Sequence, residues 1–321
     1  MGMYNTITDH CKLTKDRDLQ YYVVDGMDVV KKEMLRLLNV IDEICVEYKL
    51  KYWIDGGTLI GAVRHGGFIP WDDDIDISML KPDYLILIRE LENRTSLVNA
   101  KEYLWYSGNN KNQHCCNYLC SKMNLYGRPK GTFGFVPIKL DIRPINIIEN
   151  SEESIRLNKE LREIANEWIF GKSYIPLSNI SDNYRKLSKN DFFKFYNEEY
   201  GIKEYSEGLL ALPYYEFATD TLYPKDSFKE VIRKSFENQM TFILQNYDSY
   251  LKALYGNYME LPPLENRVPA QYEYISFDLP FKMIINILQN PSRYKTIRLF
   301  NSLKLYGIKN FIRIIKEIVI H

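Results

Sequence analysis

Apolar residues between positions 27 and 49 recur at the three- and four-residue spacing of an amphipathic helix. This pattern predicts one long helix that packs its apolar side against a sheet. A second helix is predicted from Pro82 to about Asn93, because proline is favoured in the first turn of a helix. Apolar runs of strand length stand near residues 51–55, 103–107, 118–126 and 137–147. The chain is therefore expected to form a mixed β-sheet flanked by helices.

Four aspartates stand in the five positions 72–76, at Asp72, Asp73, Asp74 and Asp76. Asp74 and Asp76 alternate with isoleucines, so on a strand both carboxylates point to one side and the isoleucines to the core. Two like charges this close repel each other unless a cation lies between them. Hard divalent ions with oxygen ligands, Mg²⁺ above all, meet this need and also bind substrate phosphates. On the aspartates alone, a solvated acidic turn or a calcium loop is the alternative.

A glycine turn comes shortly before the acidic run. Gly56 and Gly57 follow the predicted strand 51–55 and remove side chains where the backbone must turn sharply or approach a ligand closely. Thr58 is expected to cap a short helix, which ends before Gly66-Gly67. A helix N-terminus behind glycines favours anions, because its free N–H groups and its dipole attract phosphate. The sequence thus predicts a phosphate cradle next to a metal-binding strand.

A third acidic residue, Asp141, lies between Leu140 and Ile142 in the apolar run VPIKLDIRPIN. A charge inside a core strand is costly unless it is paired or bound to a metal ion. Asp141 is therefore either a further metal ligand or the partner of Lys139 or Arg143 in an ion pair.

The stretch DGGTLIGAVRHGGFIPWDDDIDI resembles the signature of the LicD family of phosphocholine transferases, whose distant relatives include the fukutin-type ribitol-phosphate transferases. Weaker similarity lies in Ser121-Lys122-Met123 with Gly131-Thr132, in LDIRPIN, and in YLKALYGNYMELPPLENR at 250–267. The resemblance covers roughly residues 27–267. It implies an α/β fold of the α+β type, with a nucleotidyltransferase-like mixed β-sheet flanked by helices and a mostly helical C-terminal extension.

Carried over position by position, the resemblance implies that Asp74 and Asp76 bind metal and that Asp141 is the third acid and the candidate general base. Asp72 matches the first acid of the family's triple and is expected to bind metal or a metal-bound water. The candidate catalytic residues are therefore Asp141, Asp74, Asp76, Arg64 and His65, of which His65 either faces the donor's diphosphate or orients the loop. The candidate substrate-binding residues are Gly56, Gly57, Thr58, Lys122 and Arg267.

Three departures from the family pattern concern the acceptor and the later contacts. Arg143 stands where the family often has Phe, and Asn146 where it has a further Asp. The segment VPAQYEY after Arg267 lacks the histidines that the family often shows there.

The implied reaction is Mg²⁺-dependent transfer of phosphocholine from CDP-choline to a sugar hydroxyl of a cell-surface glycan, with release of CMP. The glycan would be a teichoic acid, a lipopolysaccharide or a capsule. Two Mg²⁺ ions are expected, with Mn²⁺ as the alternative. Another CDP-linked alcohol phosphate (ribitol or glycerol phosphate), an NTP-using nucleotidyltransferase and a catalytically silent interaction protein are the alternatives. Choline is often held by an aromatic cage, for which the candidates are Tyr214, Tyr215, Tyr223, Tyr272 and Tyr274.

The division of the chain follows a change in composition. We expect a nucleotidyltransferase-like catalytic core at 1–150 and, from a charged helical segment onward, a helical extension at 151–290 that shapes the substrate site. Within it, Tyr255–Tyr258 is expected either to reach the active site or to form a packed loop. Segment 291–321 holds seven Lys and Arg against one Glu and predicts a basic amphipathic tail helix. Such a helix can lie on an anionic membrane or dock on the core or a second subunit.

The 321-residue chain has a formal net charge of zero, so we expect no nucleic-acid partner. Apolar stretches long enough to span a bilayer and a signal-peptide core are not found in the sequence. The five irregularly spaced cysteines fit reduced thiols. These features predict a cytoplasmic enzyme, with peripheral contact to the inner face of the cytoplasmic membrane through 292–321 left open. Its partners would be a CDP-alcohol donor and a glycan acceptor, either free or lipid-linked.

Overall fold

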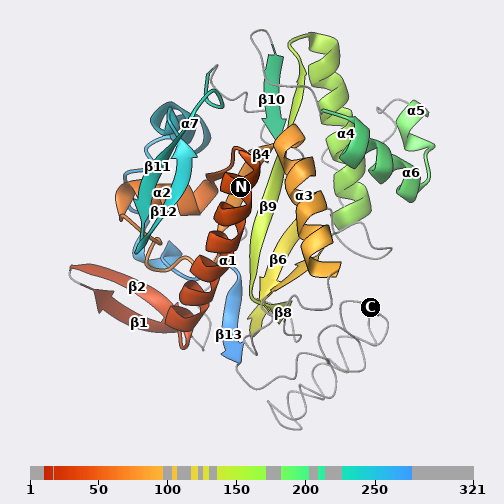
Figure 1. Ribbon diagram of the computed structural model, residues 1–321. Helices are drawn as coiled ribbons and strands as arrows, with labels where there is room; N and C mark the ends of the chain where they lie inside the picture. The colour runs from red at the N-terminus through yellow and green to blue at the C-terminus, as the bar shows by residue number, and fades with distance from the viewer. Residues whose placement is uncertain are drawn as a thin grey trace, which may run out of the picture.

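A computed structural model of the chain describes residues 11–16, 18–96, 103–106, 117–121, 126–129, 136–170, 182–201, 209–213 and 226–276. Its central element is a sheet with the strand order β3-β4-β9-β6-β5, in which β10 also pairs with β9 (Figure 1). The six strands are β3 (Trp53–Ile54), β4 (Asp76–Leu80), β5 (Tyr103–Tyr106), β6 (Asn117–Ser121), β9 (Lys139–Glu149) and β10 (Leu209–Pro213). Because β4 and β9 run parallel and the other neighbours antiparallel, the predicted mixed sheet is confirmed.

Two helices, α1 (Met27–Tyr48) and α3 (Lys81–Ser96), lie in front of the sheet in Figure 1, and both contact β9. These helices confirm the predictions for residues 27–49 and 82–93. The apolar side of α1 is fully buried because its residues recur every three or four positions. These buried residues are Val30, Met34, Leu37, Leu38, Ile41 and Ile44.

The start of the sheet is arranged as strand, helix, strand. A short helix, α2 (Gly56–Arg64), connects β3 to β4. The strand β4 starts at Asp76, so Asp74 precedes the strand in which the alternation had placed it. The direct neighbour of Asp76 on the parallel strand β9 is Asp141. Side chains of residues paired in this way lie on the same side of the sheet.

Residues after 150 form helices and strands. Three helices, α4 (Glu152–Phe170), α5 (Asp182–Arg185) and α6 (Lys189–Lys194), lie with the π-helix η2 (Phe195–Glu199) on the right of Figure 1. They enclose a second small core that includes Leu161, Ile164, Phe192 and Tyr196. The hairpin of β11 (Val231–Phe236) and β12 (Gln239–Leu244) packs into the main core through Phe236 and Leu244.

The other elements surround these two cores. They are the hairpin of β1 (Cys11–Asp16) and β2 (Leu19–Val24), the helix α7 (Tyr247–Tyr255), the 3₁₀ turn η3 (Leu264–Asn266), and a small sheet ordered β13-β7-β8 from β7 (Tyr126–Pro129), β8 (Val136–Pro137) and β13 (Tyr272–Ser276). Because β10 and β13 pair with strands from the first 150 residues, the division at residue 150 stays a prediction.

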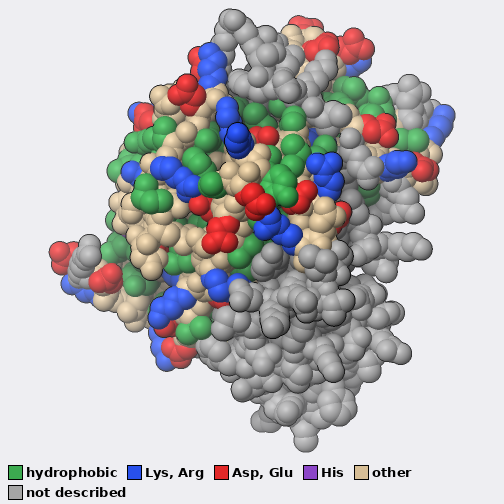
Figure 2. Space-filling view, viewed as in Figure 1, with side chains coloured by type: hydrophobic (Ala, Val, Ile, Leu, Met, Phe, Trp, Pro, Cys, Tyr) green, Lys and Arg blue, Asp and Glu red, His purple; other side chains and the backbone are tan. Residues whose placement is uncertain are grey.

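Two further sequence predictions can be compared with the described residues. Within those ranges, no helix combines the length and the apolar character needed to cross a membrane. The tail 291–321 lies outside them, so its amphipathic helix stays a prediction. Figure 2 shows acidic and basic side chains interspersed on the viewed face, in keeping with the zero net charge of the whole chain.

A buried lysine connects the central sheet to the second core. Lys81, the first residue of α3, has 0% of its surface exposed. Its ammonium group donates hydrogen bonds to the side-chain oxygen of Asn146 (3.1 Å), to the carbonyl of Tyr196 and to the carbonyl of Tyr200 (2.6 Å). Burial lowers the pKa of Lys81 to about 7. Lys81, at the start of α3, therefore connects β9 to η2 through one titratable side chain.

Replacing Lys81 by methionine is expected to lower the free energy of unfolding by about 3 kcal/mol at pH 7, because three oxygen acceptors lose this donor. The folded-state pKa of Lys81 lies below its unfolded value of 10.5, so the unfolded chain binds more protons between about 7 and 10.5. The wild-type chain should therefore gain stability relative to K81M as the pH rises from 7 to 10, by up to about 1.4 kcal/mol per pH unit. Urea unfolding measures both effects; identical pH slopes for the two proteins would contradict the lowered pKa.

Candidate active site

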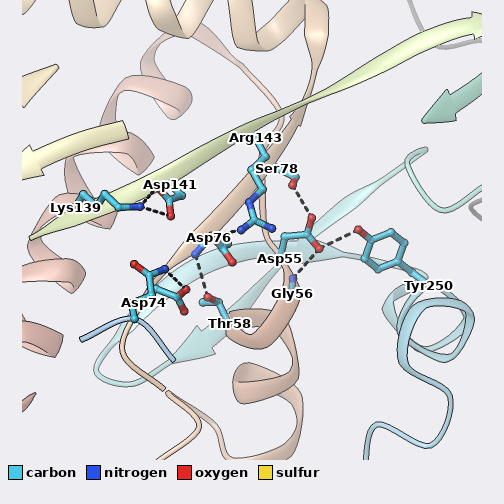
Figure 3. Close-up of polar contacts among 11 residues, drawn as sticks. Asp55, Gly56, Thr58, Asp74, Asp76, Ser78, Lys139, Asp141, Arg143 and Tyr250 are labelled. Atoms are coloured by element: carbon cyan, nitrogen blue, oxygen red, sulfur yellow. Dashed lines mark hydrogen bonds and ion pairs between the residues drawn. The ribbon is translucent and has the colours of Figure 1, made fainter. Parts of the chain in front are cut away.

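The glycine turn is organised by Asp55, which directly follows β3 (Figure 3). One carboxylate oxygen, Oδ1, accepts hydrogen bonds from the backbone N–H of Gly56 (2.8 Å) and from the hydroxyl of Tyr250 (2.9 Å). The other, Oδ2, accepts one from the hydroxyl of Ser78 (2.5 Å). Asp55 is therefore the N-cap of α2, and the expectation that Thr58 fills this position is wrong. Asp is a preferred N-cap residue, so the sequence contained this signal.

Thr58 has a different part in the site. Its hydroxyl oxygen accepts a hydrogen bond from the backbone N–H of Asp76 (3.1 Å), so it holds the start of β4 against α2. Gly56 has a φ of +55°, a backbone conformation that residues with a Cβ rarely adopt. A Cβ atom at Gly57 would lie only 2.8 Å from Oδ2 of Asp72. The two glycines thus allow the first turn of α2 to approach the acidic residues closely.

Two of the four candidate metal-binding acids have cationic partners. Asp76 is buried, and its Oδ1 lies 3.0 Å from Nη2 of Arg143. Both carboxylate oxygens of Asp141 accept hydrogen bonds from Nζ of Lys139, at 2.5 and 2.6 Å. The ion pair with Lys139 that the sequence left open is therefore present. Each cation offsets part of the repulsion between the two neighbouring carboxylates.

The other two acids lie next to this pair. Oδ2 of Asp74 accepts a hydrogen bond from the side-chain amide of Gln271 (2.5 Å). Burial and the charge of Asp141 raise the pKa of Asp74. Burial and the neighbouring carboxylates, Asp74 first, raise the pKa of Asp72 well above its ordinary value. Oδ2 of Asp72 is buried and has no hydrogen-bond partner among the described residues. The charges of Asp74 and Asp76 both act on Asp72, so these two acids lie near it.

The chemistry of these side chains fits magnesium. All four donors are carboxylates, the ligand type that Mg²⁺ prefers, and the buried oxygen of Asp72 has unused capacity to bind a cation. As the side chains stand, no group of three His, Cys, Asp or Glu residues within the described ranges is close enough together to hold a metal ion. The binding of metal by Asp72, Asp74, Asp76 and Asp141 therefore stays a prediction.

Asp73 is fully buried. Its carboxylate accepts hydrogen bonds from three consecutive backbone N–H groups, those of Ala270, Gln271 and Tyr272, at 2.6 to 3.0 Å. This clamp holds the segment that leads into β13 beside the acidic run, and it brings Gln271 to Asp74. Asp73 and Gln271 are not among the residues for which the sequence predicted a role. The partners of Asp73 lie almost 200 positions later in the chain, so no local pattern could have identified them.

The two candidate arginines, Arg64 and Arg267, donate hydrogen bonds to backbone carbonyls. Nη1 of Arg64 donates hydrogen bonds to the carbonyls of Tyr258 (2.6 Å) and Glu260 (3.0 Å). Nε of Arg267 donates to the carbonyl of Pro262 (2.8 Å), and its guanidinium lies 5.9 Å from the ring centroid of Trp71. Both side chains therefore shape the loop that follows α7.

His65 follows α2 and packs edge-on against the ring of Trp71, with 6.3 Å between the centroids. Burial and the positive charges of Arg64 and Lys31 lower the pKa of His65 to about 4. The imidazole is therefore neutral at pH 7. It can accept or donate a hydrogen bond there but contributes no charge toward a diphosphate.

The segment Tyr255–Tyr258, at the end of α7, reaches the glycine turn through Tyr255. This agrees with the first of its two predicted positions, next to the active site. The hydroxyl of Tyr255 lies 3.6 Å from the position of a Cβ at Gly56, and half of the Tyr255 surface is exposed. Burial of the hydroxyl and the charge of Asp55 raise the pKa of Tyr255. A protonated phenol therefore stands at the edge of the glycine turn.

Several other predicted residues cannot be placed. Lys122 and three of the proposed cage tyrosines, Tyr214, Tyr215 and Tyr223, lie outside the described residues, and of Tyr274 only the backbone is described. Tyr272 is fully buried in the core and is therefore not accessible to a ligand.

Comparison with known proteins gives a family match and several relatives. Residues 49–181 match the family model of the LicD/FKTN/FKRP nucleotidyltransferase domain. Over 253 residues the chain is 28% identical to the lipopolysaccharide cholinephosphotransferase LicD of Haemophilus influenzae, a match that covers 75% of this chain and 95% of that protein. An uncharacterized protein of Rickettsia typhi is 29% identical over 157 residues, 49% of this chain and 47% of its own length. The ribitol 5-phosphate transferase FKRP of Mus musculus is 50% identical over 34 residues, 11% of this chain and 7% of that protein.

Proposed function

Because residues 49–181 form a nucleotidyltransferase domain of the LicD/FKTN/FKRP family, we propose that the protein is a phosphotransferase that moves phosphocholine from CDP-choline to a sugar hydroxyl and releases CMP. The sugar would belong to a cell-surface glycan, with a lipopolysaccharide favoured over a teichoic acid or a capsule because of the LicD protein of Haemophilus influenzae. The observation that carries the proposal is the parallel register of β4 and β9, which makes Asp76 and Asp141 neighbours beside the glycine turn.

The donor's phosphates would lie over the glycine turn. The first turn of α2 offers backbone N–H groups there, and Gly56 and Gly57 have no side chain to obstruct a phosphate. The hydroxyl of Tyr255 stands beside Gly56 and could donate a hydrogen bond to the same phosphates. Arg64 supports this region indirectly, because it holds the loop that follows Tyr255.

Mg²⁺ would be held by the carboxylates of Asp74, Asp76 and Asp141, with Asp72 as a further ligand or the holder of a metal-bound water. When bound, the ion would neutralise the diphosphate and the charge that develops on the leaving CMP. Asp141 would accept the proton of the incoming sugar hydroxyl, which makes it the candidate general base. Lys139 would keep its carboxylate aimed at the acceptor side.

The donor alcohol is the least constrained part of the proposal. The match to a ribitol 5-phosphate transferase favours CDP-ribitol as the second candidate, although it covers only 34 residues. CDP-glycerol would need the same contacts to the diphosphate. A nucleotidyltransferase that uses an NTP would need the same acids, but it would release pyrophosphate in place of CMP.

Full-length protein incubated with Mg²⁺, a lipopolysaccharide acceptor and one nucleotide at a time is expected to release CMP from CDP-choline at least about tenfold faster than from CDP-ribitol or CDP-glycerol, because one pocket contact is worth about 1–3 kcal/mol. Chromatography of CMP and pyrophosphate distinguishes the outcomes. Faster CMP release from CDP-ribitol would indicate that the enzyme transfers ribitol phosphate in place of phosphocholine. Release of pyrophosphate from CTP would indicate a nucleotidyltransferase. No release from any nucleotide would end the proposal.

A further inference from the structure

Arg143 stands where the family often has an uncharged Phe, so it adds a positive charge to this site. It lies on β9 in register with Ser78 of β4, two positions beyond Asp141. Because side chains two positions apart on a strand share a face, Arg143 projects to the side that carries Asp76 and Asp141. Figure 3 shows its side chain reaching from β9 to the carboxylate of Asp76.

The contact is close and sheltered. Nη2 of Arg143 lies 3.0 Å from Oδ1 of Asp76, and the side chains of the two residues are 33% and 8% exposed. A guanidinium stays charged at any physiological pH, so Asp76 has a permanent cation next to it. A divalent ion bound to the same carboxylate oxygen would be repelled by that cation at short range. Arg143 therefore competes with a divalent ion for this oxygen of Asp76.

The balance of charges among these side chains also favours a single divalent ion. Lys139 and Arg143 offset two of the four negative charges on the candidate metal-binding acids. Even when Asp72 and Asp74 are both ionised, only two negative charges remain, and one divalent cation is enough to balance them. A second divalent cation would leave these acids and their two cationic partners with a net positive charge.

We propose that the Arg143 guanidinium takes the place of one divalent ion, so that this chain binds a single metal ion where two are expected for its fold. The inference rests on the proposed function. In this arrangement Arg143 neutralises Asp76 and places a permanent positive charge beside the donor's phosphate. The single metal ion is then held by the other three acids together with Oδ2 of Asp76, the oxygen that faces Gly56.

Mn²⁺ serves as the probe, since its binding can be counted by electron paramagnetic resonance without any catalytic turnover. We expect one bound Mn²⁺ per chain for the wild-type protein and for Arg143→Lys, which keeps the charge. We expect two for Arg143→Met, which keeps a long side chain but removes the charge, with spectral broadening from coupling between the two ions. Arg143→Phe, with the residue that the family often has there, gives a second neutral variant in case Arg143→Met does not fold.

The outcomes separate the two proposals. Two Mn²⁺ in the wild-type protein, or one in folded neutral variants, would overturn the inference about Arg143 and leave the proposed function intact. Absence of Mn²⁺ binding to the wild-type protein, with or without added CDP, would overturn the metal-dependent chemistry of the proposed function itself.

Discussion

Asp76→Asn is expected to lower the rate of CMP release by about 1,000-fold or more, because it removes a charged ligand from the point where charge must be neutralised. Asp76 lies beside Asp141, faces Gly56 and contacts Arg143, so it is the most central of the four acids. Asparagine has nearly the same shape, and the backbone N–H of residue 76 keeps its hydrogen bond to Thr58. The melting temperature of the variant should therefore stay within a few degrees of the wild-type value.

The matched control is Asp25→Asn, a substitution of the same type at an exposed residue whose partner is Lys12 on the surface. It should leave CMP release unchanged, because an exposed ion pair contributes little. The two variants would be compared by initial rates and by circular dichroism melting curves. An Asp76→Asn enzyme that keeps a tenth or more of the wild-type rate would remove Asp76 from the proposed set of metal ligands.

Asp73→Ala is expected to lower the free energy of unfolding by about 4 kcal/mol, because three backbone N–H groups lose their shared, buried acceptor. The substitution should also release Gln271 from Asp74 and lower the rate of CMP release. Asp73→Asn should have an intermediate effect, since its amide oxygen can still accept some of these hydrogen bonds.

Urea unfolding measures the loss of stability, and hydrogen exchange measures protection of the amides of residues 270–272. Asp28→Ala is the control, because Asp28 is exposed in the first turn of α1 and should contribute less than about 1 kcal/mol. Unchanged protection of the three amides in Asp73→Ala would show that the clamp does not hold this segment.

Periodic patterns in the sequence predicted the main helices and the mixed sheet well. The 3.6-residue spacing in α1 and the apolar runs of β4 and β9 need no long-range information, since each segment shows its buried side by itself. The residue pattern indicated Asp74 and Asp76 as one pair of candidate metal ligands and Asp141 as a separate candidate. The resemblance to a family implied that all three belong to one site. The register of β4 and β9 confirms that Asp76 and Asp141 are neighbours.

The missed features depend on contacts between distant segments. The roles of Asp73 and Gln271 follow from the way residues 270–272 return to the acidic run. The hairpin of β11 and β12 was missed because its strands carry charged residues such as Arg233 and Lys234, which obscure the strand pattern. Asp55 was counted as the last residue of a strand, although its position before two glycines also suits a helix cap.

The clamp between Asp73 and residues 270–272 defines the smallest part of the chain that could work alone. A fragment limited to residues 49–181, the part that matches the family domain, would leave the buried carboxylate of Asp73 without the three amides that solvate it. It would also lose Tyr250, which donates to the Asp55 cap, and the carbonyls that Arg64 holds. The autonomous unit must therefore run at least to the end of β13, so shortened versions made for crystallisation or screening should keep Ser276.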